Sequence, residues 1–87
     1  ATVTNGTAIG ANARVDADNA LVLGSVSGVN GATATASVGI GVTVPLARLH
    51  VAGGALRVDT LGVAGATSLC RNASNEIATC SSSLRYK

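Results

Sequence analysis

Apolar side chains recur in short triplets, each split by one polar or glycine position, through the middle of the chain. The stretch opens with VGIG at 38–41 and continues as three triplets, LHV at 49–51, LRV at 56–58 and LGV at 61–63. Residues two apart share one face of a strand, so each triplet predicts a short half-buried strand with its central position turned outward. Pro45, the glycine-rich stretch 52–55 and Asp59-Thr60 predict bends or turns between these strands.

A weak internal repeat precedes this region. Ala8-Ile9-Gly10 and Val22-Leu23-Gly24 stand 14 residues apart, and Gly39-Ile40-Gly41 follows the second by 17. A repeated strand of small residues predicts a stack of similar turns. Between these repeats, Ala alternates with Thr or Ser over residues 32–37, directly after the turn signal Asn30-Gly31. This alternation predicts a further strand, with a solvated linker as the alternative.

The composition limits what one copy of the chain can bury. Apolar residues make up 47% of the 87 positions, but Phe, Trp and Met are absent and Tyr86 is the only aromatic residue. Apolar burial contributes about 25 cal/mol per Å², so small side chains gain little against backbone entropy. The charged fraction of 11%, with many Val and Thr, argues against a disordered tail and a helical bundle. We therefore expect an all-β chain whose copies share one core.

Charged and polar residues indicate no cofactor and no metal. The net charge of +2 is too small and too scattered for nucleic-acid binding, and no apolar run reaches the roughly 18 residues of a membrane span. Asp16, Asp18 and Asn19 allow a calcium interpretation, beside the interpretation as polar turn residues. His50 has no second histidine or carboxylate pair near it in sequence, which favours an exposed or inter-chain histidine. It would bind metal only if a threefold axis joined three copies.

Two cysteines enclose a stretch rich in turn formers. Cys70 and Cys80 flank Asn72-Ala73-Ser74-Asn75, and a hairpin centred on Ser74 to Glu76 would place them opposite one another. This predicts a Cys70–Cys80 disulfide, because compact zinc sites need paired cysteines or histidine partners that are missing here. A stable disulfide implies export from the reducing cytosol.

Two parts of the chain resemble known fibre proteins. The VGIG, Pro45 and LHV pattern of residues 38–51 resembles the segment upstream of the intramolecular chaperone domain of phage tail fibres and tailspikes, and of similarly built bacterial surface proteins. Residues 5–27, NGTAIGANARVDADNALVLGSVS, resemble the head repeats of trimeric autotransporter adhesins, in which each chain forms a left-handed β-roll and three rolls pack together. The chain departs from that pattern at residues 15–18, where a glycine-containing turn is usual.

The resemblance implies a homotrimeric fibre segment with β-roll-like or β-helix-like head repeats, short interlocked strands and a C-terminal hairpin. It divides the chain into adhesin-like repeats at 1–36, a fibre β-segment at 37–68, the Cys-bracketed hairpin at 69–80 and the start of a chaperone junction at 81–87. The residues expected in the trimer core are Ile9, Leu23, Ile40, Leu49, Val51, Leu56 and Val58.

The implied function is structural: an extracellular stalk, on a bacterial surface or a phage virion, that extends and presents a binding tip. Any glycan or receptor would be bound by parts outside this chain. The final residues suggest an alternative, since they resemble the opening of the self-cleaving chaperone domain, where a serine and a lysine five residues on release the chaperone. Ser82 and Lys87 have that spacing. A lysine held neutral by desolvation can take the proton of a serine hydroxyl. We expect no enzyme in the chain as it stands, and a polar tail is the other interpretation of these residues.

Overall fold

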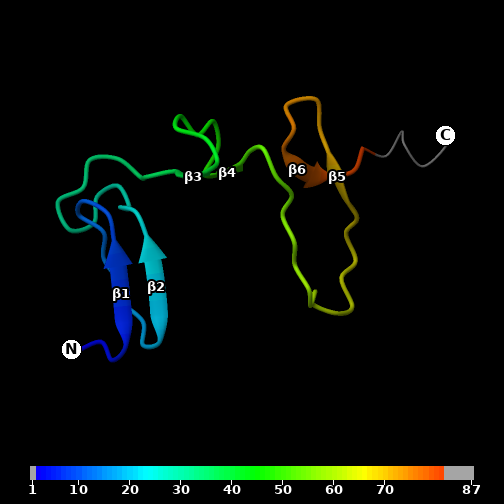
Figure 1. Cartoon of the computed structure of the whole chain (residues 1–87). Helices are drawn as coiled ribbons and strands as arrows, with labels where there is room; N and C mark the ends of the chain where they lie inside the picture. Colours follow the sequence, from blue (N-terminus) through cyan, green and yellow to red (C-terminus); the bar gives the residue numbers. More distant parts are fainter. Residues whose placement is uncertain (1, 82–87) are drawn as a thin grey trace. The chain divides into compact units, whose positions relative to one another are not determined.

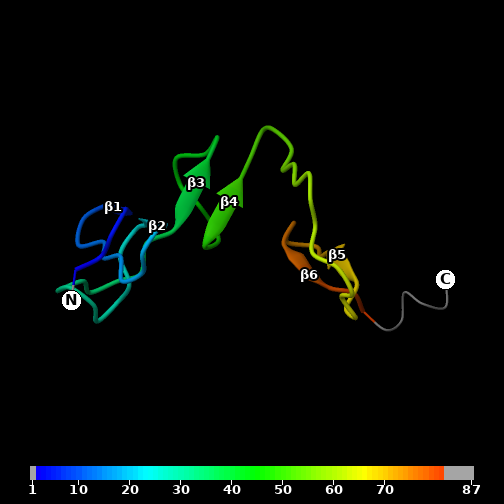
Figure 2. The same cartoon turned by 90° about the horizontal axis from the view of Figure 1, so that it is seen from below.

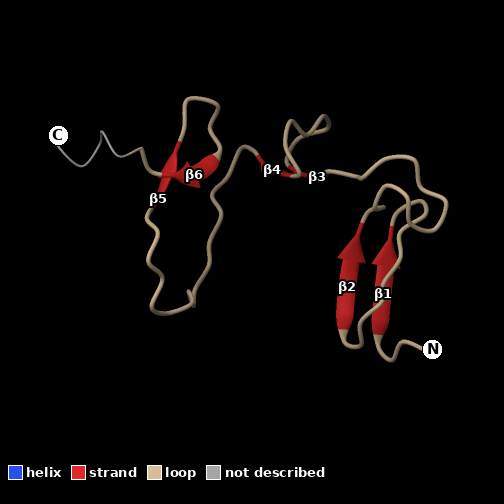
Figure 3. Cartoon of the chain, turned by 180° about the vertical axis from the view of Figure 1, so that it is seen from behind, coloured by secondary structure: helices blue, strands red, loops and turns tan. Residues whose placement is uncertain are grey.

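The chain is all-β, with six short strands and no helix in residues 2–81, the part that the computed structural model describes (Figures 1 and 3). The strands are β1 Gly6–Ile9, β2 Ala20–Leu23, β3 Val38–Ile40, β4 Leu49–Val51, β5 Leu69–Arg71 and β6 Ile77–Thr79. They form three two-stranded sheets, β1–β2, β3–β4 and β5–β6. The expected all-β class is confirmed, and no helix within this range is long and apolar enough to cross a membrane.

Strands β1 and β2 lie side by side and run parallel (Figure 1). Their Cα partners run from Gly6↔Ala20 to Ile9↔Leu23, so every residue pairs with the residue fourteen positions later. The spacing of the sequence repeat is therefore the register of the sheet. Two parallel strands need a crossover that brings the chain back to the end of the sheet where the first strand begins. Residues 10–19 make this crossover without a helix.

Asparagines set the corners of this crossover. Asn5, Asn12 and Asn19 have φ angles of 58°, 60° and 56°. This left-handed region is tolerated by asparagine better than by most residues, because its short amide can bond locally. The Asn5 Nδ2 donates to Asn19 Oδ1 at 3.0 Å, and the Thr4 N–H donates to Asp18 Oδ1 at 2.8 Å. Both bonds span fourteen residues, so side chains hold the corners in the same register as the strands.

A glycine lets the next segment of chain approach the end of β2. Gly24 has a φ of 89°, and a Cβ built on it would lie 2.6 Å from the Ala36 Cβ. Its N–H donates to the Ile9 carbonyl at 2.7 Å, and the Ala36 N–H donates to the Ser25 carbonyl at 3.0 Å. Residues 24 and 25 are thus bonded to the preceding segment on one side and to the following segment on the other.

We expect Gly24→Ala to destabilise the chain more than Gly28→Ala does. Gly28 has nearly the same φ, 84°, but a Cβ there would meet nothing within 4 Å. Both variants carry the left-handed penalty of about 1 to 2 kcal/mol, and only Gly24→Ala adds overpacking of about 1 to 3 kcal/mol. Urea unfolding of the two variants measures the difference. Equal losses would show that the close approach of Ala36 contributes nothing to stability.

The strand predicted at residues 32–37 is not formed. Asn30 and Gly31 do make the expected turn, with φ angles of 54° and 78°, and an i→i+3 bond of 3.0 Å closes it onto Ala32. The residues that follow form their hydrogen bonds with the loop at residues 25–28, partly through side chains, so they have no strand ladder. Ala32 is 7% exposed and is the only buried residue in the described part of the chain.

Strands β3 and β4 also run parallel, with Cα partners Val38↔Leu49 and Ile40↔Val51 (Figure 2). The offset here is eleven residues, three fewer than in β1–β2. The Val38 N–H donates to the Arg48 carbonyl at 2.7 Å, which extends the pairing beyond the first strand residue. The triplet at 49–51 is therefore a strand, as predicted, and its partner is the strand at 38–40.

The triplets at 56–58 and 61–63 are not strands, contrary to the prediction. A three-residue alternation specifies a strand only if a partner strand is present, and within residues 2–81 neither triplet has one. The chain divides into two compact units, Ala1–Arg57 and Val58–Lys87, and the second is described as far as residue 81. The triplet at 56–58 spans this division, and the triplet at 61–63 follows it in the second unit.

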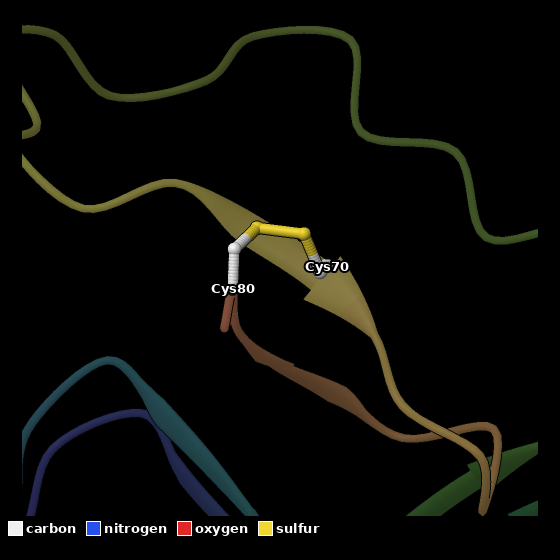
Figure 4. Close-up of a disulfide and its surroundings, with 2 residues drawn as sticks. All are labelled: Cys70 and Cys80. Atoms are coloured by element: carbon white, nitrogen blue, oxygen red, sulfur yellow. A yellow bond between two sulfur atoms is a disulfide. The ribbon is translucent and has the colours of Figure 1, made fainter. Parts of the chain in front are cut away.

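Strands β5 and β6 form the predicted C-terminal hairpin, and its disulfide is present between Cys70 and Cys80 (Figure 4). The register differs from the prediction. Cys70 pairs with Ala78, so Cys80 lies two residues after that partner, just past the end of β6, and is a diagonal neighbour of Cys70 on the same face. The two Cα atoms are 4.9 Å apart, which is within the range that a disulfide spans. The hairpin loop is therefore centred on Ser74, one residue earlier than expected.

Candidate functional site: apolar strand faces open to solvent

The β1–β2 sheet leaves its larger side chains in solvent. Ile9 and Leu23 are Cα partners, and Leu21 lies on the same side two residues before Leu23. All three are about half exposed. The opposite side of the sheet holds Gly6, Ala8, Ala20 and Val22, and a Cβ built on Gly6 would lie 2.6 Å from a methyl group of Val3. On this side Ala20 and Val22 are half-buried, whereas both leucines of β2 on the other side are exposed.

The β3–β4 sheet repeats this arrangement. Ile40 is 55% exposed and Leu49 is 56% exposed, on the side that they share with the half-buried Val38 and Val51. A Cβ added to Gly39, on the other side, would lie 2.7 Å from the Val42 carbonyl oxygen, because the loop at 41–48 folds back there. In the single chain Ile40 and Leu49 are therefore exposed, and their inward position in a trimer stays a prediction. On the other side the loop at 41–48 lies against Gly39, and His50 is half-buried.

His50 holds that loop in place. Its Nδ1 accepts a hydrogen bond from the Leu46 N–H at 3.0 Å, and the side chain is half-buried. An imidazole nitrogen that accepts from a backbone amide has its lone pair engaged, so Nδ1 is not free to bind a metal ion. His50 thus points away from Leu49 and serves as an anchor for the loop. Of the two expected positions, the exposed one is corrected, because His50 is half-buried and makes a contact within the chain, and the inter-chain one stays a prediction.

Arg48 joins the start of β4 to the segment before β3. Its Nη1 donates to the Ala36 carbonyl at 2.5 Å and the Thr35 carbonyl at 3.1 Å, and lies 3.3 Å from the Ser37 Oγ. Hydrogen bonds from a charged donor are stronger than neutral ones. Sequence reasoning missed this role, because an exposed arginine beside a strand carries no signal of what it will contact. Only its position directly before the LHV triplet indicated that Arg48 lies beside a strand.

The carboxylates considered as calcium ligands are used within the chain. Asp16 Oδ1 lies 2.7 Å from Arg14 Nε, and Asp18 Oδ1 accepts from the Thr4 N–H. Asn19 accepts from the opposite corner, as described above. These contacts favour the interpretation as turn residues. In residues 2–81 no three His, Cys, Asp or Glu side chains gather as metal ligands would.

The remaining expected site residues are scattered. Leu56 and Val58 are exposed and lie outside the strands of the described residues. Cys70 and Cys80 are bonded to each other in the hairpin. Ser82 and Lys87, expected as nucleophile and base of a self-cleaving unit, lie outside the described residues.

The hairpin loop depends on one asparagine that the sequence reasoning treated only as a turn former. Asn72 Oδ1 accepts from the Ser74 N–H at 2.9 Å and the Glu76 N–H at 3.0 Å. Its Nδ2 donates to Glu76 Oε1 at 2.9 Å. Asn75 supplies the left-handed residue of the turn, with a φ of 65°. The amide side chain of Asn72 therefore reinforces a loop that the backbone also closes, through bonds from the Asn72 N–H to the Glu76 carbonyl and from the Asn75 N–H to the Asn72 carbonyl, both at 3.0 Å.

We expect Asn72→Ala to lower the stability of the hairpin by about 1 to 3 kcal/mol, because two loop amides lose their acceptor. Faster hydrogen exchange at the Glu76 amide measures this loss. The matched control is Asn75→Gly, which accepts the left-handed conformation without a side chain and should leave the exchange rate nearly unchanged. If both variants exchanged alike, the Asn72 side chain would not be what closes the loop.

No family model, no curated protein and no solved structure matches this chain.

Proposed function

We propose that this chain is a structural segment of an extracellular homotrimeric β-fibre, which extends and stiffens the fibre and presents a binding tip located elsewhere. The observation that carries the proposal is the inverted burial of the two parallel sheets. In both, a neighbouring segment of the chain folds against the side that carries a glycine, and the Ile and Leu side chains on the other side stay about half exposed. Exposed apolar surface organised on strands is typical of a surface that another chain covers.

The lack of a core supports association as a condition of stability. Among residues 2–81 only Ala32 is buried, while large apolar side chains stay exposed in both units. A domain of this size is only marginally stable even when its core is well packed. When the core is smaller still, disulfides or oligomers supply the missing stability. Three chains around one axis would close the open faces with identical contacts, as symmetric assemblies do.

The parallel pairs favour a β-roll or β-helix for residues 1–57 within such a fibre. Each turn of the chain would add a strand to a growing stack, with Asn corners in register and apolar strand faces directed to the fibre axis. Side chains too large for the inside of the turn would then form the shared core. In this arrangement Ile9, Leu23, Ile40, Leu49 and Val51 are core residues of the trimer.

Native mass spectrometry and sedimentation of the purified chain, with its disulfide intact, test the proposal. We expect a species of three 8.4 kDa chains that persists on dilution, because folding and association are coupled. A folded monomer with protected β1–β2 amides would overturn the trimeric fibre. A stable dimer would overturn the threefold arrangement as well.

A further inference from the structure

The chain contains two Asn-Gly dipeptides, Asn5-Gly6 and Asn30-Gly31, with the same covalent chemistry in different surroundings. Asparagine is chemically labile, and an Asn followed by Gly is especially so. The reason is that glycine has no side chain to shield its backbone nitrogen from the preceding side-chain amide. Comparing the two dipeptides therefore isolates what the fold does to this reactivity.

The Asn30-Gly31 dipeptide is exposed to solvent. Both residues are exposed, and a Cβ built on Gly31 would meet nothing within 4 Å. The Asn30 Nδ2 lies 3.5 Å from the Ala13 carbonyl, at the outer limit of a hydrogen bond. The Gly31 N–H has no acceptor among the residues that the structure describes. Rotation of this peptide requires only the opening of one exposed turn.

Asn5-Gly6 is held. The Asn5 Nδ2 donates to Asn19 Oδ1 at 3.0 Å, and Gly6 is the first residue of β1, in register with Ala20. A Cβ built on Gly6 would lie 2.6 Å from one methyl group of Val3, which shows how closely this glycine is packed. Rotation of this peptide requires β1 to leave the sheet, which is a larger opening of the chain.

We propose that Asn30 is a site of spontaneous self-modification in the folded chain and that the fold protects Asn5. The backbone nitrogen of Gly31 attacks Cγ of Asn30 and an N–Cγ bond forms. The Cγ–Nδ2 bond then breaks, and ammonia leaves with the proton that the nitrogen carried. Water adds to either carbonyl of the resulting five-membered imide and opens it, which yields aspartate or isoaspartate. The step needs no oxidant, metal or second protein.

The modification has a structural consequence at Ala32, the one buried position among residues 2–81. The turn that contains Asn30 is closed by the bond from the Ala32 N–H to the Val29 carbonyl at 3.0 Å, and the Gly28 N–H donates to the Ala32 carbonyl at 2.9 Å. Isoaspartate inserts an extra methylene into the main chain between these bonds. The turn then no longer fits its left-handed geometry, and Ala32 loses its packing. The modified chain should therefore be less stable than the original.

The test incubates the folded chain in mildly alkaline buffer and follows the two sites by peptide mapping. Trypsin cleavage after Arg14 and Arg48 separates them, because Asn5 falls in peptide 1–14 and Asn30 in peptide 15–48. Replacing NH₂ by OH raises the mass by about one dalton, and fragment spectra assign it to a residue. We expect Asn30 to react about tenfold faster than Asn5, since Asn5 must first lose its hydrogen bonds.

Two controls keep the comparison interpretable. In concentrated urea with the disulfide retained, the two sites should react at similar rates, because the fold no longer distinguishes them. In Asn30→Gly, which tolerates the same turn, the mass change in peptide 15–48 should disappear. A rate at Asn5 equal to or above that at Asn30 in the folded chain would overturn the proposal. So would an unmodified Asn30 after the time in which the urea-treated chain has fully reacted.

Discussion

Leu49→Asp is expected to abolish assembly of the chain. Leu49 lies on the open face of β3–β4, and in the proposed trimer three copies of the new carboxylate would be buried near one axis. An uncompensated buried charge costs about 3 to 5 kcal/mol, and the three copies also repel each other. Sedimentation should show only monomer at concentrations where the unmodified chain is fully assembled.

The matched control for this variant is Leu46→Asp. Leu46 lies three residues earlier in the loop at 41–48, is 82% exposed, and contributes only its N–H to the contact with His50. The same substitution there should leave assembly unchanged. Val58→Asp tests whether the interface includes residues outside the strands, because Val58 was expected in the trimer core but lies outside the strands. If Leu49→Asp assembled at full yield, the face of β3–β4 would not be the interface.

Removing the disulfide is expected to unfold the hairpin at 69–80 while the β1–β2 sheet persists. For a loop of about ten residues the cross-link contributes about 3 kcal/mol, and residues 58–81 bury no side chain that could replace it. Cys70→Ser combined with Cys80→Ser should therefore make the Arg71 peptide bond readily cleavable by trypsin. Cleavage at Arg14 in the first unit is the internal reference and should keep its original rate.

The chain without the disulfide could instead resist cleavage at Arg71 as well as the oxidised chain does. That result would show that the loop contacts of Asn72 are enough to hold the hairpin. Loss of protection at Arg14 in the same experiment would show that the two units depend on each other for stability.

The sequence pattern predicted the elements that repeat. Ala8-Ile9-Gly10 and Val22-Leu23-Gly24 recur at fourteen residues, and the same spacing became the register of β1–β2, because a parallel stack pairs equivalent residues. The Cys70–Cys80 bond was predictable for a related reason, since the turn formers between the cysteines leave few ways to fold back.

The rest depended on partners that local pattern does not describe. LHV at 49–51 and LRV at 56–58 have the same alternation, but only the first has a strand within reach to pair with. The two carbonyls that Arg48 contacts are twelve and thirteen residues away in sequence, and nothing about arginine indicates them. Nor did the Ala alternation at 32–37 distinguish a strand from a loop whose polar groups bond to an earlier loop.

The fourteen-residue register of β1 and β2 also determines which length changes the chain can accept. Deleting one residue between Gly10 and Asn19 would move every side chain of β2 to the opposite face, so that Leu21 and Leu23 would point at Val3 and Val15. It would also take Asn19 out of line with Asn5. Duplicating a whole fourteen-residue unit leaves faces and corners in register and simply lengthens the stack. Such a chain can grow or shrink by whole units, while single-residue insertions and deletions are its most damaging changes.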